Sequence, residues 1–316
     1  MMLARVADSL YWVGRYVERA EHLSRLALVM LNATLDRAEA GDQAADIARG
    51  AVGRALPDSE AAPIETARAL VLDREAESSV AVSSFRAREN ARQVRDQITS
   101  EMWESLNRLY LESSGAEAER AFNQRAPAFL ARAIADLHLF RGATDATMSH
   151  GEGRRFMMTG LYLERAQLMA RLLKAGLHDH ALTADDHAAM VSLLRMACAL
   201  EPYLREYTAE VTPQSVLRFL MFDESFPRSI RFATARMEEH LGALSQGREM
   251  GREWARSDPA RIAGRLNASL AFADIEEGAD GGAKGLIEAV GAGCRAIDKA
   301  VHETFVAYPL ELRLPA

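Results

Sequence analysis

Two Glu-Arg pairs hold the side chains of this sequence that are best suited to chemistry. Glu18-Arg19 lies in GRYVERA at 14–20, and Glu164-Arg165 lies in GLYLERA at 160–166. A carboxylate can act as a general acid or base, and a guanidinium stays positively charged and binds carboxylates or phosphates. Glu18 and Glu164 are therefore candidate catalytic residues, and the two arginines are candidate anion-binding residues.

The helices that must hold these pairs follow from the hydrophobic pattern. Apolar residues recur every three or four positions through 2–36, and 152–178 has the same character. Arg19 falls at the edge of the apolar flank, between Trp12 and Leu26. Because a guanidinium among apolar side chains needs an anionic partner, we expect a carboxylate or a phosphate beside it.

The partner of each arginine is expected on the other helix. Neighbouring residues of a helix point about 100° apart, so Glu18 cannot pair with Arg19. Glu18 is expected on the polar side of its helix, with Tyr11, Arg15, His22 and Arg25. The predicted cross-pair joins Arg19 to Glu164 and Arg165 to Glu18. Such a pair is more often a device that sets helix register than a functional site, and the sequence leaves both interpretations open.

The two Glu-Arg segments also indicate an internal repeat. Seven residues of the first segment match the second at a constant offset of 146 positions, from Gly14 and Gly160 to Leu26 and Leu172. A weaker echo pairs Ser84-Phe85 with Ser225-Phe226. We predict two related helical halves, 1–150 and 151–316, that form one compact unit.

A second group of arginines lies in SFRARENARQVRDQITSEMWESLN at 84–107. On a predicted helix over 77–113, Arg88, Arg92 and Arg95 share one face, flanked by Phe85 and Trp103, with Glu89 on another side. Three arginines on one stripe repel each other, so an anion should meet them: carboxylates of other helices, which we favour, or a phosphate or an acidic peptide. The full set of candidate substrate-binding or anion-binding residues is Arg15, Arg19, Arg165, Tyr11, Tyr16, Tyr162, Arg88, Arg92, Glu89, Asn90, Trp103 and Arg228.

Composition and pattern predict an all-α protein, a multi-helix bundle without significant sheet. The 316 residues are 49% hydrophobic and 26% charged, and Ala, Leu, Arg and Glu dominate. The net charge of −7 disfavours nucleic-acid binding. The chain has no run of 18 apolar residues and no secretory leader pattern, so we expect a cytoplasmic protein that does not bind membranes. The other predicted helices are 44–55, 63–75, 116–125, 127–148, 184–200, 203–211, 213–222, 227–246, 254–276 and 283–307, with a loop at 276–285.

Motifs for self-sufficient catalysis are missing from the sequence. There is no G-x-x-x-x-G-K-[ST] phosphate loop, G-x-S-x-G elbow, C-x-x-C pair or Glu-x-x-His signature. Glu18 and His22 have the spacing to share a metal, and HDHALTADDH at 178–187 gathers histidines and aspartates. Surface residues and a helix junction are the favoured interpretations, so no metal and no cofactor are expected.

Four segments together resemble the bacterial Alpha-E family: 2–26, 86–107, GLYLERAQLMARLL at 160–173 and FPRSIRF at 226–232. The family is named for an all-helical domain with a Glu-Arg motif, which corresponds to Glu18-Arg19 and again to Glu164-Arg165. Proteins that resemble this family are encoded in operons together with circularly permuted ATP-grasp ligases and transglutaminase-like peptidases. The resemblance implies these two proteins as partners and a role in making, attaching or trimming a peptide or amide-linked product.

Three functions remain to be weighed. The first is an accessory subunit that docks the ligase and holds an acidic substrate or peptide in its Arg/Glu/Tyr groove. The second is a purely structural helical scaffold. The third is an enzyme in its own right, with Glu18 and Glu164 as acid/base groups and Arg19, Arg88 and Arg165 orienting an anionic substrate. We favour them in that order, because the sequence has no nucleotide loop of its own.

Overall fold

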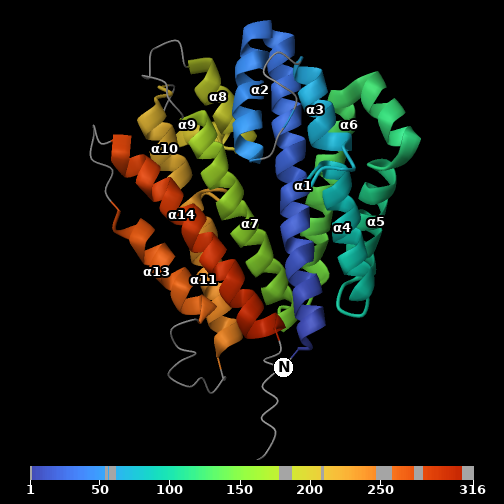
Figure 1. The fold of residues 1–316 in the computed structure, drawn as a ribbon, viewed down its shortest axis with the longest axis vertical. Coiled ribbons are helices and arrows are strands. Elements are labelled where there is room, and N and C mark those ends of the chain that lie inside the picture. Colours follow the sequence, from blue (N-terminus) through green and yellow to red (C-terminus); the bar gives the residue numbers. More distant parts are fainter. Residues whose placement is uncertain are drawn as a thin grey trace, which may run out of the picture.

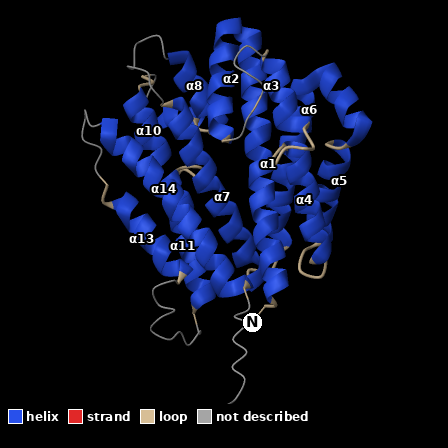
Figure 2. Ribbon diagram, viewed as in Figure 1, coloured by secondary structure: helices blue, strands red, loops and turns tan. Residues whose placement is uncertain are grey.

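A computed structural model describes residues 2–53, 56, 62–177, 187–207, 210–246, 258–273 and 280–307. Within these ranges the chain consists of helices joined by loops and has no β-strand, as Figure 2 shows. The all-α prediction is confirmed. The helices of the first part of the chain are α1 (Ala4–Asp36), α2 (Ala38–Val52), α3 (Pro63–Leu72), α4 (Val80–Gln93), α5 (Ser100–Glu112) and α6 (Gly115–Thr147). Those of the second part are α7 (Glu152–Gly176), α8 (His187–Met196), α9 (Leu200–Glu206), α10 (Pro213–Phe222), α11 (Ile230–Ser245), α13 (Pro259–Ala271) and α14 (Asp280–Val301), which continues into a π-turn, His302–Val306.

The two Glu-Arg helices, α1 and α7, pack against each other along the middle of the molecule (Figure 1). Two glycines allow their backbones to approach closely. A Cβ atom on Gly14 would overlap the carbonyl oxygen of Met157, and one on Gly160 would overlap the carbonyl oxygen of Tyr11. The contact is reciprocal, since each glycine faces the residue that stands three positions before the other glycine. Glycine at these two positions therefore fixes where the helices meet.

The remaining long helices surround this pair in two similar groups. In the first group α1 packs on α4 and α6, and α5 lies between those two helices. In the second group α7 packs on α11 and α14, and α13 lies between them. Buried apolar side chains from both groups form one continuous core, which includes Leu10 and Val17 of α1 and Leu163 and Leu172 of α7. The crossing of α1 and α7 is thus enclosed by helices from both parts of the chain.

The predicted helix 77–113 is wrong, because the structure divides it into α4 and α5. Val94 leaves helical geometry at φ −125°, and α5 begins only after Thr99, whose hydroxyl accepts a hydrogen bond from the Met102 amide. This segment has no Gly or Pro, so the break carries no strong sequence signal. The predicted division of 116–148 at Pro127 corresponds to a kink in α6, where Arg125 has non-helical dihedral angles.

Two further predictions concern segments that lie partly outside the described residues. The predicted loop 276–285 is too long, because α14 already begins at Asp280, and residues 274–279 lie outside the described part of the chain. Most of the histidine-rich and aspartate-rich segment, 178–186, also lies outside it. Among the described residues, no helix has the length and hydrophobicity needed to span a membrane.

Candidate functional site

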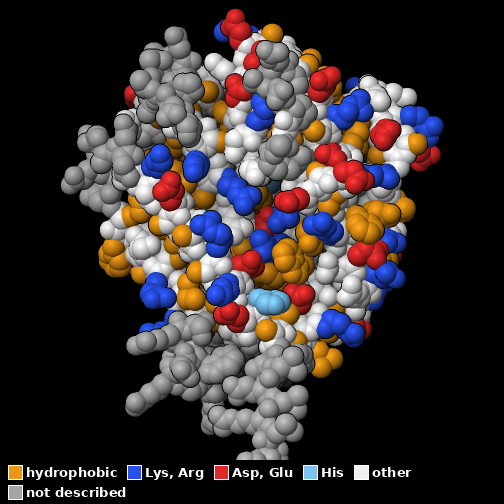
Figure 3. Space-filling view, viewed as in Figure 1, with side chains coloured by type: hydrophobic (Ala, Val, Ile, Leu, Met, Phe, Trp, Pro, Cys, Tyr) orange, Lys and Arg blue, Asp and Glu red, His pale blue; other side chains and the backbone are white. Residues whose placement is uncertain are grey.

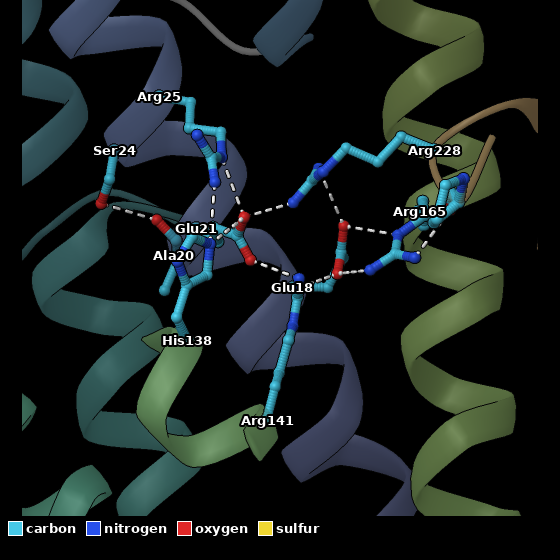
Figure 4. Close-up of polar contacts among 10 residues, drawn as sticks. Glu18, Ala20, Glu21, Ser24, Arg25, His138, Arg141, Arg165 and Arg228 are labelled. Atoms are coloured by element: carbon cyan, nitrogen blue, oxygen red, sulfur yellow. Dashed lines mark hydrogen bonds and ion pairs between the residues drawn. The ribbon is translucent and has the colours of Figure 1, made fainter. Parts of the chain in front are cut away.

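Glu18 stands at the centre of an ionic network at the crossing of α1 and α7 (Figure 4). Its carboxylate is 1% exposed, although the sequence placed it on the polar side of its helix. Arg165 of α7 binds it with two hydrogen bonds, from Nε to Oε1 at 3.0 Å and from Nη2 to Oε2 at 2.8 Å. Arg228, in the turn before α11, donates to Oε1 at 3.3 Å, and Arg141 of α6 pairs with Oε2. Glu18 therefore joins four segments of the chain.

Glu164 occupies the equivalent place on α7. It accepts hydrogen bonds from Arg19 Nε at 2.6 Å and from Arg15 Nε at 2.8 Å. The predicted cross-pair is therefore present on both sides: Arg19 meets Glu164, and Arg165 meets Glu18. Each arginine also lies over a tyrosine three positions earlier, Arg19 at 5.5 Å from the Tyr16 ring and Arg165 at 5.3 Å from the Tyr162 ring.

A third buried carboxylate, Glu21, extends the network and was missed by the sequence analysis. It accepts from Arg25 Nε at 2.8 Å, its Oε2 lies 2.6 Å from Arg141 Nη1, and Arg228 donates to its Oε1. The ring of His138 lies 3.4 Å from the same carboxylate. Arg141 and Arg228 therefore each bridge Glu18 and Glu21, and Figure 4 shows both bridges.

Two clusters with different charge result. The Glu18 cluster comprises Glu18, Glu21, Arg25, Arg141, Arg165 and Arg228, so four guanidinium groups face two carboxylates. The Glu164 cluster comprises Arg15, Arg19, Glu164 and Asp298, so two guanidinium groups face two carboxylates. One cluster is neutral, and the other has a formal excess of two positive charges.

The Glu164 cluster is edged by aromatic side chains. Tyr11 donates to Asp298 at 2.6 Å, and Arg15 donates to the same carboxylate at 2.7 Å. Trp12 stacks on Tyr16, and the Arg15 guanidinium lies 4.6 Å from the Trp12 ring. On the face shown in Figure 3, acidic and basic side chains gather near the centre of the molecule. Burial and the carboxylate of Asp298 raise the pKa of Tyr11 well above its ordinary value, so this hydroxyl stays protonated and remains a donor.

The buried carboxylates are permanently ionised at neutral pH. Burial alone would raise the pKa of Glu18, but the charges of Arg141, Arg165 and Arg228 lower it to about 2. The pKa values of Glu164 and Glu21 are also lowered, because nearby arginines outweigh the effect of burial. A general acid or base works best with a pKa near the working pH, so these carboxylates suit charge pairing better than proton transfer.

His22 is buried beside these clusters and is neutral. Burial and the charge of Arg228 lower its pKa to about 4, although the nearby glutamates act in the opposite direction. Its Nε2 atom is buried and has no hydrogen-bond partner in the described part of the chain. Across the residues that the structure describes, no three His, Cys, Asp or Glu side chains gather as a metal site would require.

The candidates on α4 and α5 lie apart from the crossing. Arg88 donates to Asn107 at 2.8 Å and to Glu89 at 2.7 Å, and Arg92 donates to Glu89 at 2.7 Å. Trp103 lies under Arg88 at 5.4 Å, and Asn90 donates only to a backbone carbonyl of its own helix. These hydrogen bonds and ring contacts stay within α4, α5 and the turn between them, so the structure does not bring these side chains to Glu18 or Glu164.

The predicted single row of arginines is also interrupted. Because α4 ends at Gln93, Arg95 stands in the following turn, where its guanidinium lies 5.1 Å from the Trp103 ring. Glu89 was expected on another side of the helix, yet its carboxylate lies between Arg88 and Arg92, because long side chains reach across one turn. A carboxylate of the same helix therefore meets two of the three arginines, whereas carboxylates of other helices were expected.

The chain belongs to the Alpha-E family, described as a predicted alpha-helical domain with a conserved ER motif, which it matches over residues 2–306. The Glu-Arg crossing contains that motif twice. The chain is 27% identical to an uncharacterized protein of Mycobacterium bovis and 26–27% identical to uncharacterized proteins of two Mycobacterium tuberculosis strains. Each match covers 89% of this chain but 34% of the relative, so the chain spans about a third of the length of these relatives. No solved structure matches the chain significantly.

Proposed function

We propose that the protein is an accessory subunit that holds an acidic substrate or partner for an ATP-grasp ligase and a transglutaminase-like peptidase. The observation that carries the proposal is the Glu18 cluster, which keeps two more positive than negative charges in a largely buried place. A buried excess of charge is costly unless an anion compensates it. An acidic peptide or an organic acid would supply that compensation.

The accessory role fits the chemistry of the carboxylates better than catalysis by this chain alone. An acid/base role for Glu18 would require a pKa near neutrality, whereas three arginines lower it to about 2. A partner with its own nucleotide site would supply ATP chemistry. A purely structural scaffold explains the ion pairs, but it gives no reason for the unequal charges of the two clusters. Because such a ligase consumes ATP, the proposed place of action is the cytoplasm.

The length of the relatives also supports a role beside other protein domains. The mycobacterial proteins continue for about twice the length that this chain matches. The partnership with the ligase and the peptidase remains part of the proposal.

The same proposal includes an origin in two related halves, 1–150 and 151–316. Three observations support it: the reciprocal contacts of Gly14 and Gly160, the reciprocal Glu-Arg pairs, and the similar packing of α4, α5 and α6 around α1 and of α11, α13 and α14 around α7. On this view the crossing formed as a symmetric contact, and the neighbouring helices later changed its charge.

Reconstitution tests the accessory function. The chain would be purified with an ATP-grasp ligase of the proposed kind and mixed with a Glu-rich peptide and ATP. We expect a stable complex by size-exclusion chromatography, ADP release that needs both proteins, and no ATP turnover by the chain alone. Absence of a complex, or conversion of the peptide by this chain alone, would overturn the proposal.

A further inference from the structure

A cavity of about 300 Å³ lies beside the Glu18 cluster, between α6, α7 and the turn before α11. Its position next to the crossing places it against Gly14 of α1. The basic residues that line it are Arg141, Arg154, Arg165 and Arg228, and the other lining residues include Phe140, Thr144, Asp145, Met157, Met158, Leu161, Tyr162 and Pro227. Three of the four arginines that balance Glu18 and Glu21 therefore also face this cavity.

The arginines that line the cavity have hydrogen-bonding capacity to spare. Glu18 and Glu21 can neutralise two of the four guanidinium groups in their cluster. Arg154 is balanced separately by Asp145 at 2.7 Å. The Nε atoms of Arg141 and Arg154 are buried and have no hydrogen-bond partner among the described residues. These two atoms are enclosed by protein, so the positive charge that faces the cavity comes from the excess guanidinium groups of the Glu18 cluster.

The size and walls of the cavity exclude a bare inorganic anion as its best occupant. A space of about 300 Å³ is far larger than one small anion fills. Phe140, Met157, Met158 and Leu161 add apolar side chains to its lining. Cavities that bind organic molecules combine an apolar lining with a few convergent polar groups. The occupant that fits has an anionic end and a short aliphatic body.

Among the described residues, the other side of the crossing has no excess of positive charge. Glu164 and Asp298 neutralise Arg15 and Arg19 there, and Asp298 comes from α14, whereas α6 supplies Arg141 on the cavity side. An anion at the Glu164 cluster would meet a neutral group of charges that already includes two carboxylates. An acidic ligand is therefore expected on the cavity side alone.

We propose that this cavity binds a carboxylate carried on a short aliphatic chain, such as the side chain of a glutamyl residue in an acidic peptide. The carboxylate accepts hydrogen bonds from Arg141 and its neighbours, and the methylene groups pack against Met157, Met158 and Leu161. This inference deepens the proposed function and rests on it for the acidic nature of the substrate. Binding to the cavity is measured without any ligase, so failure of the two ideas can be told apart.

Isothermal titration calorimetry on the complete chain tests this site with three probes. Glutarate has the proposed chemistry, glutaramide is its uncharged analogue, and inorganic phosphate is a bare anion. We expect glutarate to bind at least about tenfold more tightly than either of the others, since a charge-assisted hydrogen bond to a buried guanidinium is worth about that factor. Equal binding of glutarate and glutaramide, or equal binding of glutarate and phosphate, would overturn the proposal.

Two variants assign the binding to the cavity. Arg141→Gln should weaken glutarate binding about tenfold, whereas Arg132→Gln, on an exposed part of the same helix, should leave it unchanged. Met158→Trp should block binding by filling the cavity while it leaves every arginine in place, and its thermal unfolding shows that it is folded. If both Arg141→Gln and Met158→Trp bind glutarate as the parent protein does, the site lies elsewhere and the proposal is wrong.

Discussion

The two sides of the α1–α7 crossing use the same Glu-Arg motif and reach different electrostatic states. In both clusters a glutamate of one helix binds the arginine of the other. The difference comes from the helices that pack alongside, because α6 brings Arg141 to Glu18 and α14 brings Asp298 to Arg15. The motif therefore fixes how the two long helices meet, and the neighbouring helices decide which side is neutral and which side attracts an anion.

The difference in charge also suggests different roles for the two clusters, one in stability and one in ligand binding. A buried pair with balanced charges and complete hydrogen bonds recovers most of its desolvation cost, whereas a cluster with excess charge does not. The Glu164 cluster has the properties of a structural pair. The Glu18 cluster keeps an uncompensated charge beside a cavity, which is a common arrangement where a protein binds a ligand of the opposite charge.

The largest expected effect is that of Glu18→Gln. Loss of this carboxylate leaves Arg141 and Arg228 with Glu21 and removes the carboxylate that Arg165 binds. Breaking a buried ion pair by removing one partner costs about 3 to 5 kcal/mol, so we expect the free energy of unfolding to fall by that amount. Urea denaturation measures it. The control Glu112→Gln should cost less than about 1 kcal/mol, because its pair with Arg132 is on the surface.

A cost of Glu18→Gln no greater than that of Glu112→Gln would show that the Glu18 cluster does not hold the crossing together. Glu164→Gln sharpens the comparison further. It should cost less than Glu18→Gln, since Asp298 remains to balance Arg15. The opposite order would mean that the neutral cluster carries more of the stability.

Acid should destabilise the protein in the range where His22 takes up a proton. The pKa of His22 is lowered to about 4, mainly by burial, so between pH 6.5 and 4 the unfolded chain binds a proton that the folded chain does not. The stabilising contribution is therefore complete above about pH 6.5 and is lost as the pH falls to 4, by about 3 kcal/mol. Glu18 acts later, because its pKa is about 2 and its contribution disappears as the pH falls below about 4.5.

Urea unfolding at several pH values checks this prediction. In His22→Gln the slope of stability between pH 6.5 and 4 should become shallower, while the loss below pH 4.5 should persist. An unchanged slope in this variant would assign the first phase to another group, and His240 is the alternative, since burial also lowers its pKa to about 4.

A double-mutant cycle tests the cross-pairs themselves. We expect coupling energies of about 1 to 3 kcal/mol for Arg165→Gln with Glu18→Gln and for Arg19→Gln with Glu164→Gln. The first should be larger, because Arg165 binds Glu18 through two nitrogen atoms and is 7% exposed, whereas Arg19 uses one and is 19% exposed. Additive effects at either pair would contradict the cross-pairing.

The crossing was predictable from the sequence because two regularities acted together. Helical periodicity disfavoured a bond between Glu18 and Arg19, although the neighbours Arg88 and Glu89 do pair, and the offset of 146 placed the same motif on a second helix. The break between α4 and α5 was not predictable, since Val94 and its neighbours include no Gly or Pro. Arg141 and Asp298 were missed for a different reason: each is one charged residue in an amphipathic helix, and only tertiary packing selects it.

The smallest expected effect is that of Arg141→Gln on the free energy of unfolding, and its comparison with Arg15→Gln distinguishes the two clusters most directly. Burial lowers the pKa of Arg141 despite Glu18 and Glu21, with Arg165 and Arg228 adding to the shift, so its charged form is held at a cost to the fold. The pKa of Arg15 is raised by Glu164, Tyr11 and Asp298 despite its burial, so its charged form stabilises the fold.

Arg141→Gln should therefore change the free energy of unfolding by less than about 1 kcal/mol, whereas Arg15→Gln should lower it by about 2 kcal/mol or more. Arg165 and Arg228 still bind Glu18 in the first variant, and Arg25 and Arg228 still bind Glu21. Urea unfolding without added organic anions measures both, and an equal loss of stability in the two variants would mean that the excess charge at the Glu18 cluster is already compensated within the chain.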